Sequence, residues 1–356
     1  MVSSRGTRTA FADKRVVTIG GGTGPFAVLS SLKHMHCAIT AIVSMADSGG
    51  SSRRLMDEFG QLPFGDLRQA LVALSRNGVL WRDVFNFRFR SANGDGESEK
   101  GVSGHSLGNL IISALQDINS GDLLAAIQDA QELLATAGDV LPVTLEHTTL
   151  CAELEDGSVI QGETNIDLRG QNHFGALSPV QRVYLDHATP ACHQALRAIR
   201  RADIITIGPG DLYTSIIPNL LVEGIAGAIR ESEAEKVYVC NLMTKHGETD
   251  SFKASDYVNA VHAYLGGRVD RVILHDGSFP ETLLQNYALQ QQFPVDADVE
   301  VVREMVTDVM VERLTAPNVD YVRHDPERLV RAILAPYQPS SLTPTIPLSA
   351  RQAYEG

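Results

Sequence analysis

The sequence predicts an α/β protein with a Rossmann-like, doubly wound and mostly parallel sheet, to which a smaller antiparallel and helical lobe is appended. Three observations predict this class: β-branched runs that end in glycine- or serine-rich turns, helical patterns that follow these turns, and one intervening stretch in which apolar residues alternate. A chain of 356 residues can bury the core of a large domain with a lobe. We expect a flexible leader at 1–14, the α/β domain at 15–336 with an inserted lobe at about 140–190, and a flexible tail at 337–356.

Charge and composition exclude several function classes. The formal net charge of −13 argues against general nucleic-acid binding, because no basic face is available to release counterions from a nucleic acid. No stretch has the length and apolarity of a signal peptide or a membrane span, so we expect a cytoplasmic protein without membrane insertion. The four cysteines are far apart and form no Cys-x-x-Cys pair, which is typical of reduced core residues.

The first strand, turn and helix predict an anion site. A β-branched strand at 16–19 runs into glycines at 20–22 and 24, and an amphipathic helix follows at 26–33. Glycine turns let the backbone approach a ligand closely, and a helix N-terminus offers unpaired N–H groups to a phosphate. Pro25 breaks the dinucleotide fingerprint, and no Gly-Lys-Ser/Thr follows as in a P-loop. The alternative is a tight strand-to-helix connection without a ligand.

A second strand, at 38–45, ends in another polar loop. Asp47, Ser48, Ser51 and Ser52 follow it directly, and in open α/β sheets this edge is where ligands bind. Asp47 could hold a divalent cation or a ligand hydroxyl, while the serines suit oxygen-rich groups. A turn that caps a helix explains Asp47 and Ser48 nearly as well.

Two helix starts carry further candidate side chains. Asp66 precedes a helical pattern at 67–74, where capping of the helix is the strong alternative to a ligand role. His105 and Asn109 lie at the start of an apolar helix at 107–115 and could face a ligand, although a buried structural histidine is the more common case.

The alternating runs from 140 to 166, with the turn Asp156-Gly157 between them, predict an antiparallel subdomain or sheet extension that also includes 180–185. Asn165 lies at the end of this hairpin and could reach the cleft, or it could belong to a plain hairpin terminus.

The α/β pattern then resumes and repeats the design of the first turn. A strand at 203–207 ends in Gly-Pro-Gly-Asp-Leu-Tyr-Thr-Ser at 208–215, which offers a second set of backbone donors to an anion. A further buried strand at 236–242 ends in the polar residues Asn241 and Thr244.

Together these stretches resemble the YvcK/CofD-like family, and its YvcK branch in particular. The matching pieces cover most of the chain in the expected order: TIGGGTG (18–24), ADSGGSSRRL (46–55), FGQLPFGDLRQALVAL (59–74), FNFRF (85–89), GHSLGNL (104–110), GPGDLYTSIIPNLLV (208–222), VYVCNLMTKHGETD (237–250) and VRHDPERL (322–329).

The resemblance implies a Rossmann-like sheet with an appended lobe, often in a homodimer. YvcK-like members are described as binding UDP-sugars such as UDP-N-acetylglucosamine, and as factors for gluconeogenic growth and normal envelope shape. The CofD branch implies a Mg²⁺-dependent transferase, which joins 2-phospho-L-lactate from a guanylyl diphosphate donor to a deazaflavin. Both branches need a cradle for a diphosphate.

The chain departs from the family pattern in three places. Asp47-Ser48 stands where two adjacent acidic residues are usual, which weakens a Mg²⁺ site. Phe64 replaces a usual proline, and Lys245-His246 replaces a usual Gln-Pro, which alters loop shape or ligand contacts.

Three hypotheses follow. The favoured one is a UDP-sugar-binding regulator; the second is the CofD-type transferase, with Asp47 and Asp66 as catalytic candidates and Asp47 as a weak metal ligand; the third is an NAD-type protein. The residues themselves identify no cofactor, and only the transferase reading implies Mg²⁺. The ligand-binding candidates are Gly21, Gly22, Thr23, Gly24, Asp47, Ser48, Ser51, Ser52, Asp66, His105, Asn109, Asn165, Gly208, Gly210, Asp211, Tyr213, Thr214, Ser215, Asn241 and Thr244.

Overall fold

A computed structural model of the chain shows the fold. The structure describes residues 13–46, 62–89, 102, 104–171, 173, 175–277, 279–316 and 321–337. Most of the predicted leader and tail, and the candidate residues Asp47, Ser48, Ser51 and Ser52, lie outside the described residues.

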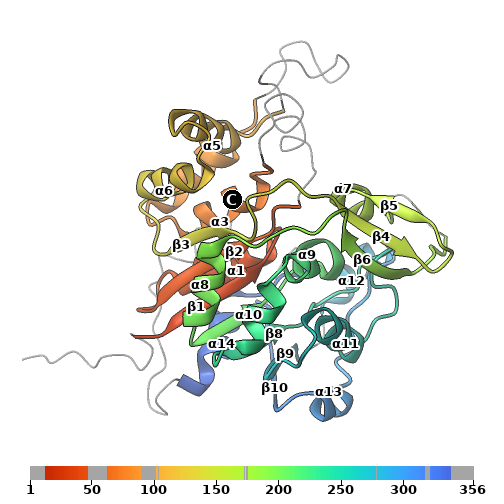
Figure 1. Ribbon diagram of the computed structural model, residues 1–356. Coiled ribbons are helices and arrows are strands. Elements are labelled where there is room, and N and C mark those ends of the chain that lie inside the picture. The colour runs from red at the N-terminus through yellow and green to blue at the C-terminus, as the bar shows by residue number, and fades with distance from the viewer. Residues whose placement is uncertain are drawn as a thin grey trace, which may run out of the picture.

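A seven-stranded parallel sheet forms the centre of the molecule (Figure 1), which confirms the predicted fold class. Its strand order is β10-β9-β8-β7-β1-β2-β3, and neighbouring strands pair in parallel throughout. The strands are β1 (Arg15–Gly20), β2 (Ala38–Val43), β3 (Asp139–Pro142), β7 (Ile204–Ile207), β8 (Glu235–Val239), β9 (Arg271–His275) and β10 (Asp308–Glu312).

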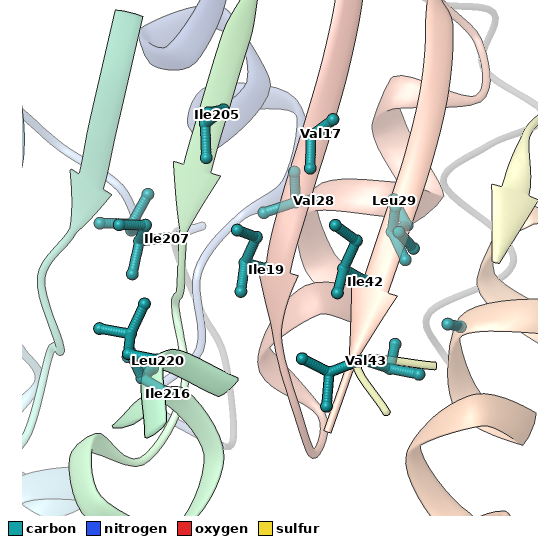
Figure 2. Packing of buried hydrophobic residues seen from close by; sticks show 14 of the residues in the cluster. Val17, Ile19, Val28, Leu29, Ile42, Val43, Ile205, Ile207, Ile216 and Leu220 are labelled. Atoms are coloured by element: carbon teal, nitrogen blue, oxygen red, sulfur yellow. The ribbon is translucent and has the colours of Figure 1, made fainter. Parts of the chain in front are cut away.

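The β-branched runs form the central strands because both faces of a parallel sheet are covered by helices. Val17 and Ile19 of β1 lie beside Ile205 and Ile207 of β7, and all four side chains are buried (Figure 2). Figure 2 also shows Val28 packed against β1, so that the first helix is held directly beneath the strand it follows.

Helices cover both faces of the sheet, as in a doubly wound fold. Helices on one face pack around α1, and those on the other continue from α8 through α10 to α11 (Figure 1). The first group is α1 (Gly24–Leu32), α3 (Gly65–Leu74) and α14 (Pro326–Leu334); the second is α8 (His193–Arg201), α10 (Ile225–Glu231) and α11 (Ala254–Leu265).

Other helices pack on these layers or on each other. At the β3 edge, α6 (Leu123–Leu134) packs against β3, while α4 (Gly78–Asn86) and α5 (Leu107–Ile118) pack against α3 and against each other. The others are the π-helix η1 (Leu212–Ile216), α9 (Ile217–Leu221), α12 (Glu281–Ala288), α13 (Val299–Met305) and the 3₁₀ helix η2 (Ala335–Tyr337). Within the described parts of the chain, no helix has the length and apolarity needed to cross a membrane.

A second, three-stranded sheet forms the appended lobe. It has the order β5-β4-β6, is antiparallel throughout, and carries the short helix α7; its elements are β4 (Leu150–Leu154), β5 (Val159–Gln161), α7 (Glu163–Asp167) and β6 (Val180–Leu185). The hairpin at Asp156-Gly157 is confirmed, with Gly157 at a φ of +82°.

The expectation that residues 140–142 belong to an antiparallel lobe was wrong, whereas the alternative of a sheet extension fits them. Residues 139–142 pair in parallel with β2 and form the edge of the main sheet. Val140 is buried and Pro142 lies at the strand end, where a missing N–H is tolerated because no further strand has to pair with it.

A buried arginine ties the last helix to the sheet. Arg271 of β9 is fully buried, and its guanidinium donates to the carbonyl oxygens of Ala332 (3.0 Å) and Ile333 (2.8 Å) and to the carboxylate of Glu235 (3.1 Å). The planar guanidinium can satisfy several acceptors at once, so it closes the C-terminal end of α14 and balances its own charge.

Candidate functional site

The strand order reverses between β1 and β7. From β1 the chain builds outward through β2 and β3, and from β7 it builds the other way through β8, β9 and β10. In open α/β sheets, ligands bind at the carboxyl ends of the strands at such a reversal. The two glycine-rich turns follow β1 and β7 directly, so both lie at this point of the sheet.

The two turns touch each other. A Cβ atom on Gly24 would lie 1.9 Å from the carbonyl oxygen of Pro209, and one on Gly210 would lie 3.5 Å from the carbonyl oxygen of Gly21. A Cβ on Gly22 would lie 3.1 Å from the Oγ of Ser215. Gly24 in particular has to be glycine, because the backbone of Pro209 approaches it more closely than a side chain allows, while Gly210 and Gly22 are in ordinary to tight contact with the facing turn.

Backbone conformation gives a second reason for glycine. Gly22 has a φ of +63° and Gly208 a φ of +77°, in the left-handed region that favours glycine, and the bond between Gly208 and Pro209 is cis. After the first turn comes the N-terminus of α1, with Pro25 in its first turn and Thr23 as its exposed N-cap residue. Neither this N-cap nor that of η1 makes a side-chain capping bond, so neither helix end is closed by its own cap residue.

Asp66 contacts the first glycine turn and does not cap α3, the helix in which it lies. The N-cap residue of α3 is Phe64, so the alternative in which Asp66 caps this helix is wrong. Its Oδ1 accepts a hydrogen bond of 2.7 Å from the backbone N–H of Gly22, and its Oδ2 would lie 2.4 Å from a Cβ on Gly21. The structure thus places a carboxylate on the glycine turn at the switch point.

Asn241 holds the second turn. It follows β8, and its Nδ2 donates to the carbonyl oxygen of Gly210 over 2.8 Å. Its Oδ1 is buried and has no hydrogen-bond partner among the residues that the structure describes. A buried amide oxygen without a donor is costly, so Asn241 offers an acceptor to a group that enters the site.

A charged cluster lies against the second turn. The ammonium of Lys245 contacts the carboxylates of Asp167, Asp211 (2.8 Å) and Glu248 (2.9 Å). Burial raises the pKa of Glu248, and the carboxylates of Asp211 and Asp167 act in the same direction, whereas the ammonium of Lys245 lowers it. Burial lowers the pKa of Lys245, but the three carboxylates outweigh this and raise it above its ordinary value.

Two residues of the second turn that carry hydroxyl groups have different neighbours: Thr214 contacts this cluster, and Tyr213 packs in the core. The Oγ1 of Thr214 lies 3.4 Å from Oε1 of Glu248. Tyr213 packs edge-on against Phe252, and burial raises the pKa of its hydroxyl. Thr244 exchanges hydrogen bonds with the backbone of Phe293 and is therefore used within the fold.

The two candidates on α5 form a separate buried group. Asn109 accepts a hydrogen bond of 3.1 Å from Nε of the buried Arg68, and its backbone N–H is bonded to Ser106. His105 is buried at the start of the same helix. Arg68 lies two residues after Asp66 on α3, so this helix connects the group to the first turn.

Asn165 lies on α7, which packs against η1 of the second turn, but its side chain is bonded within the lobe. It is exposed on α7, where its Nδ2 donates to the carbonyl oxygen of Gln161 (2.8 Å).

Two charged residues of the site, Asp167 and Glu248, were missed from the sequence, and Lys245 was noted only as a departure from the family pattern. The spacing of three between Lys245 and Glu248 is a common surface pattern and carries no information about Asp167 or Asp211.

One group of described carboxylates is compact enough for a metal ion: Asp167, Asp211 and Glu248 have carboxylate oxygens within 4.8 Å of one another. This group does not fit Mg²⁺ as it stands, because the ammonium of Lys245 is bound to all three carboxylates. Asp47, the residue expected to hold Mg²⁺ in the transferase branch, lies outside the described residues.

Comparison with known proteins decides the family. The model of the family described as 2-phospho-L-lactate transferase CofD matches residues 16–315 of the chain. The chain belongs to the YvcK/CofD-like family. This confirms the resemblance drawn from the motifs.

Curated relatives of this family member carry the name gluconeogenesis factor. A putative gluconeogenesis factor of Nostoc is 42% identical over 93% of this chain and 70% of its own length. The gluconeogenesis factor of Bacillus subtilis is 38% identical over 90% of this chain and 97% of its own length.

Solved structures agree with the fold. A crystal structure of a Bacillus halodurans protein covers 90% of this chain and 99% of its own, with a TM-score of 0.83 at 40% identity. A second structure, described as a member of the UPF0052 family, has a TM-score of 0.82 at 39% identity.

Proposed function

We propose that this YvcK/CofD-like protein binds a UDP-sugar such as UDP-N-acetylglucosamine, and that its two glycine turns together hold the diphosphate. The observation that carries this proposal is the contact between the turns at the reversal of the sheet, where Gly210 would meet the carbonyl oxygen of Gly21 if it carried a Cβ.

Backbone groups are well suited to this ligand. The protein has a formal net charge of −13, so an anion has to be held by local dipoles rather than by a basic surface. Backbone N–H groups in a glycine turn and at the start of α1 supply such dipoles without a side chain in the way. Asn241 adds a buried amide oxygen that a donor on the base or sugar can satisfy.

The cellular role that we propose follows the names of the relatives. Curated relatives of about 40% identity are called gluconeogenesis factors. We therefore assign the protein to the control of central carbon metabolism during gluconeogenic growth and of envelope morphogenesis, as a cytoplasmic homodimer.

Isothermal titration of the purified protein with UDP-N-acetylglucosamine tests the binding step. We expect saturable heat with UDP-N-acetylglucosamine, weaker binding of UDP, and much weaker binding of UMP, which lacks the diphosphate. A folded protein that gives no heat at millimolar ligand contradicts the proposal. Equal affinity for UMP contradicts the assignment of the turns to the diphosphate.

The description of the matching family model supports one alternative, the CofD-type transferase. It predicts consumption of a deazaflavin when Mg²⁺ and a guanylyl diphosphate-linked 2-phospho-L-lactate donor are supplied together. Chromatography of the deazaflavin after incubation measures this directly. Complete recovery of the starting deazaflavin eliminates the transferase reading.

A further inference from the structure

The Lys245 cluster consists of Lys245, Asp167, Asp211 and Glu248, and it has the composition of a divalent-cation site. We propose that Lys245 is the resident cation of this site: its ammonium takes the place of a metal ion and neutralises the carboxylates beside the second glycine turn.

The geometry of the cluster centres on the ammonium. Lys245 Nζ is bonded to Asp167, lies 2.8 Å from Asp211 Oδ2 and lies 2.9 Å from Glu248 Oε1. The carboxylates come from three separate elements: α7 of the lobe, the residue before η1, and the loop before α11. One cation therefore joins the lobe to the glycine turn and to the sheet.

Burial makes a cation necessary at this place. The Glu248 side chain is fully buried and that of Lys245 is 20% exposed, so water screens their charges poorly. Among the described residues, the second oxygen of Glu248, Oε2, is buried without a hydrogen-bond partner. A carboxylate oxygen of this kind is a hard ligand that a divalent cation could use if the ammonium were removed.

The cluster acts on the ligand site through Asp211. This residue follows Gly210, and its carboxylate is 42% exposed beside the turn that we assign to the diphosphate. This part of the inference depends on the proposed function. A carboxylate at this position repels an anionic ligand unless a cation is bound to it, and Lys245 supplies that cation permanently.

Removal of the ammonium should convert the cluster into a metal site. We expect the variant K245Q to bind Mn²⁺ at one new site, measured by electron paramagnetic resonance of free Mn²⁺, with an affinity roughly tenfold or more above that of any site in the unchanged protein. Binding of Mn²⁺ is measured without a nucleotide, so it can succeed or fail independently of UDP-sugar binding.

Two variants control for the position and the charge. K245R keeps a positive charge and is expected to gain no Mn²⁺ site. K245Q/D211N lacks one of the three carboxylates and is expected to lose most of the site that K245Q gains. If K245Q gains no Mn²⁺ site, or if K245Q/D211N binds the ion as tightly as K245Q, the proposal is wrong.

Folding gives a second readout. The midpoint of thermal unfolding of K245Q should fall in EDTA and recover in Mn²⁺, while the midpoint of K245Q/D211N should depend little on the ion. If K245Q folds only when Mn²⁺ is present, that dependence supports the proposal. If it fails to fold in both conditions, the ammonium does more than a cation can replace and the proposal is overturned.

Where UDP-sugar binding has been shown for the unchanged protein, K245Q should bind it more weakly in EDTA and regain affinity in Mn²⁺. Unchanged affinity in EDTA would remove the link between the cluster and the ligand while leaving the UDP-sugar assignment intact.

Discussion

The backbone N–H of Gly22 donates a hydrogen bond of 2.7 Å to the carboxylate of Asp66. The two residues are 44 positions apart, and the bond places a negative charge on the same glycine turn that we expect to receive a phosphate. Charge-assisted bonds from N–H to carboxylate are strong, so Asp66 and an anionic ligand compete for one donor.

Replacement of Asp66 by asparagine should strengthen the binding of a nucleotide diphosphate. The amide oxygen can still accept from Gly22, but the negative charge is removed from the turn. We expect the dissociation constant from isothermal titration to fall by roughly tenfold at low salt, about 1.4 kcal/mol, and by less at high salt.

Asp117→Asn is the matched control for this change. Asp117 lies in the last turns of α5 and is exposed, so the variant has the same net charge without a change at the turn. Its affinity should equal that of the unchanged protein. Weaker binding by D66N would mean that Asp66 holds a donor of the ligand or a metal ion, and competition for Gly22 would be refuted.

His324 should make the protein less stable in mild acid. Burial lowers the pKa of its imidazole to about 4, against a hydrogen bond with the backbone of Cys240 that raises it. The unfolded chain, with a histidine pKa near 6.5, therefore binds more protons than the folded protein between pH 4 and pH 6.5. This contribution to stability is complete above pH 6.5 and is lost as the pH falls to 4, by roughly 2 to 3 kcal/mol in total.

Comparison with H324Q isolates this contribution. Urea unfolding of both proteins at several pH values should show that their difference in free energy of unfolding changes between pH 6.5 and 4 and is constant from pH 7 to 8. A constant difference across the acid range would show that His324 keeps its ordinary pKa.

Much of the fold could be predicted because it depends on local patterns. A β-branched run that ends in glycines, such as the residues up to Ile19 or up to Ile207, predicts a buried parallel strand and a close turn, and the carboxyl ends of parallel strands meet at one edge. The contact between the two turns follows from these features. The strand at 139–142 was misplaced because a short alternating run has the same pattern at the edge of either sheet.

The charged part of the candidate site could not be predicted in the same way. Asp66 has the sequence position of a helix cap, and only the packing of α3 against α1 turns it toward Gly22. The partners of Lys245 come from α7 and from the turn before η1, which are 78 and 34 residues away. The residues next to a lysine in the sequence do not specify which distant carboxylates will surround its ammonium.

Gly24 and Gly227 provide the sharpest test of the contact between the two turns. Both are helical glycines, in α1 and α10, where alanine is intrinsically favoured by about 1 kcal/mol. Around Gly227 a Cβ meets only the end of the Arg230 side chain at 4.0 Å, whereas at Gly24 it would lie 1.9 Å from the carbonyl oxygen of Pro209. That oxygen belongs to the backbone of the second turn and cannot rotate away.

G24A should therefore separate the turns, while G227A should leave them together. We expect G24A to lower the free energy of unfolding by roughly 1 to 3 kcal/mol and to weaken UDP-N-acetylglucosamine binding by tenfold or more, whereas G227A should be as stable as the unchanged protein or more so. Urea unfolding and isothermal titration measure the two effects on the same samples. Should G24A fold stably and bind the ligand with unchanged affinity, a diphosphate would not be held jointly by the two turns, because they could move apart without consequence.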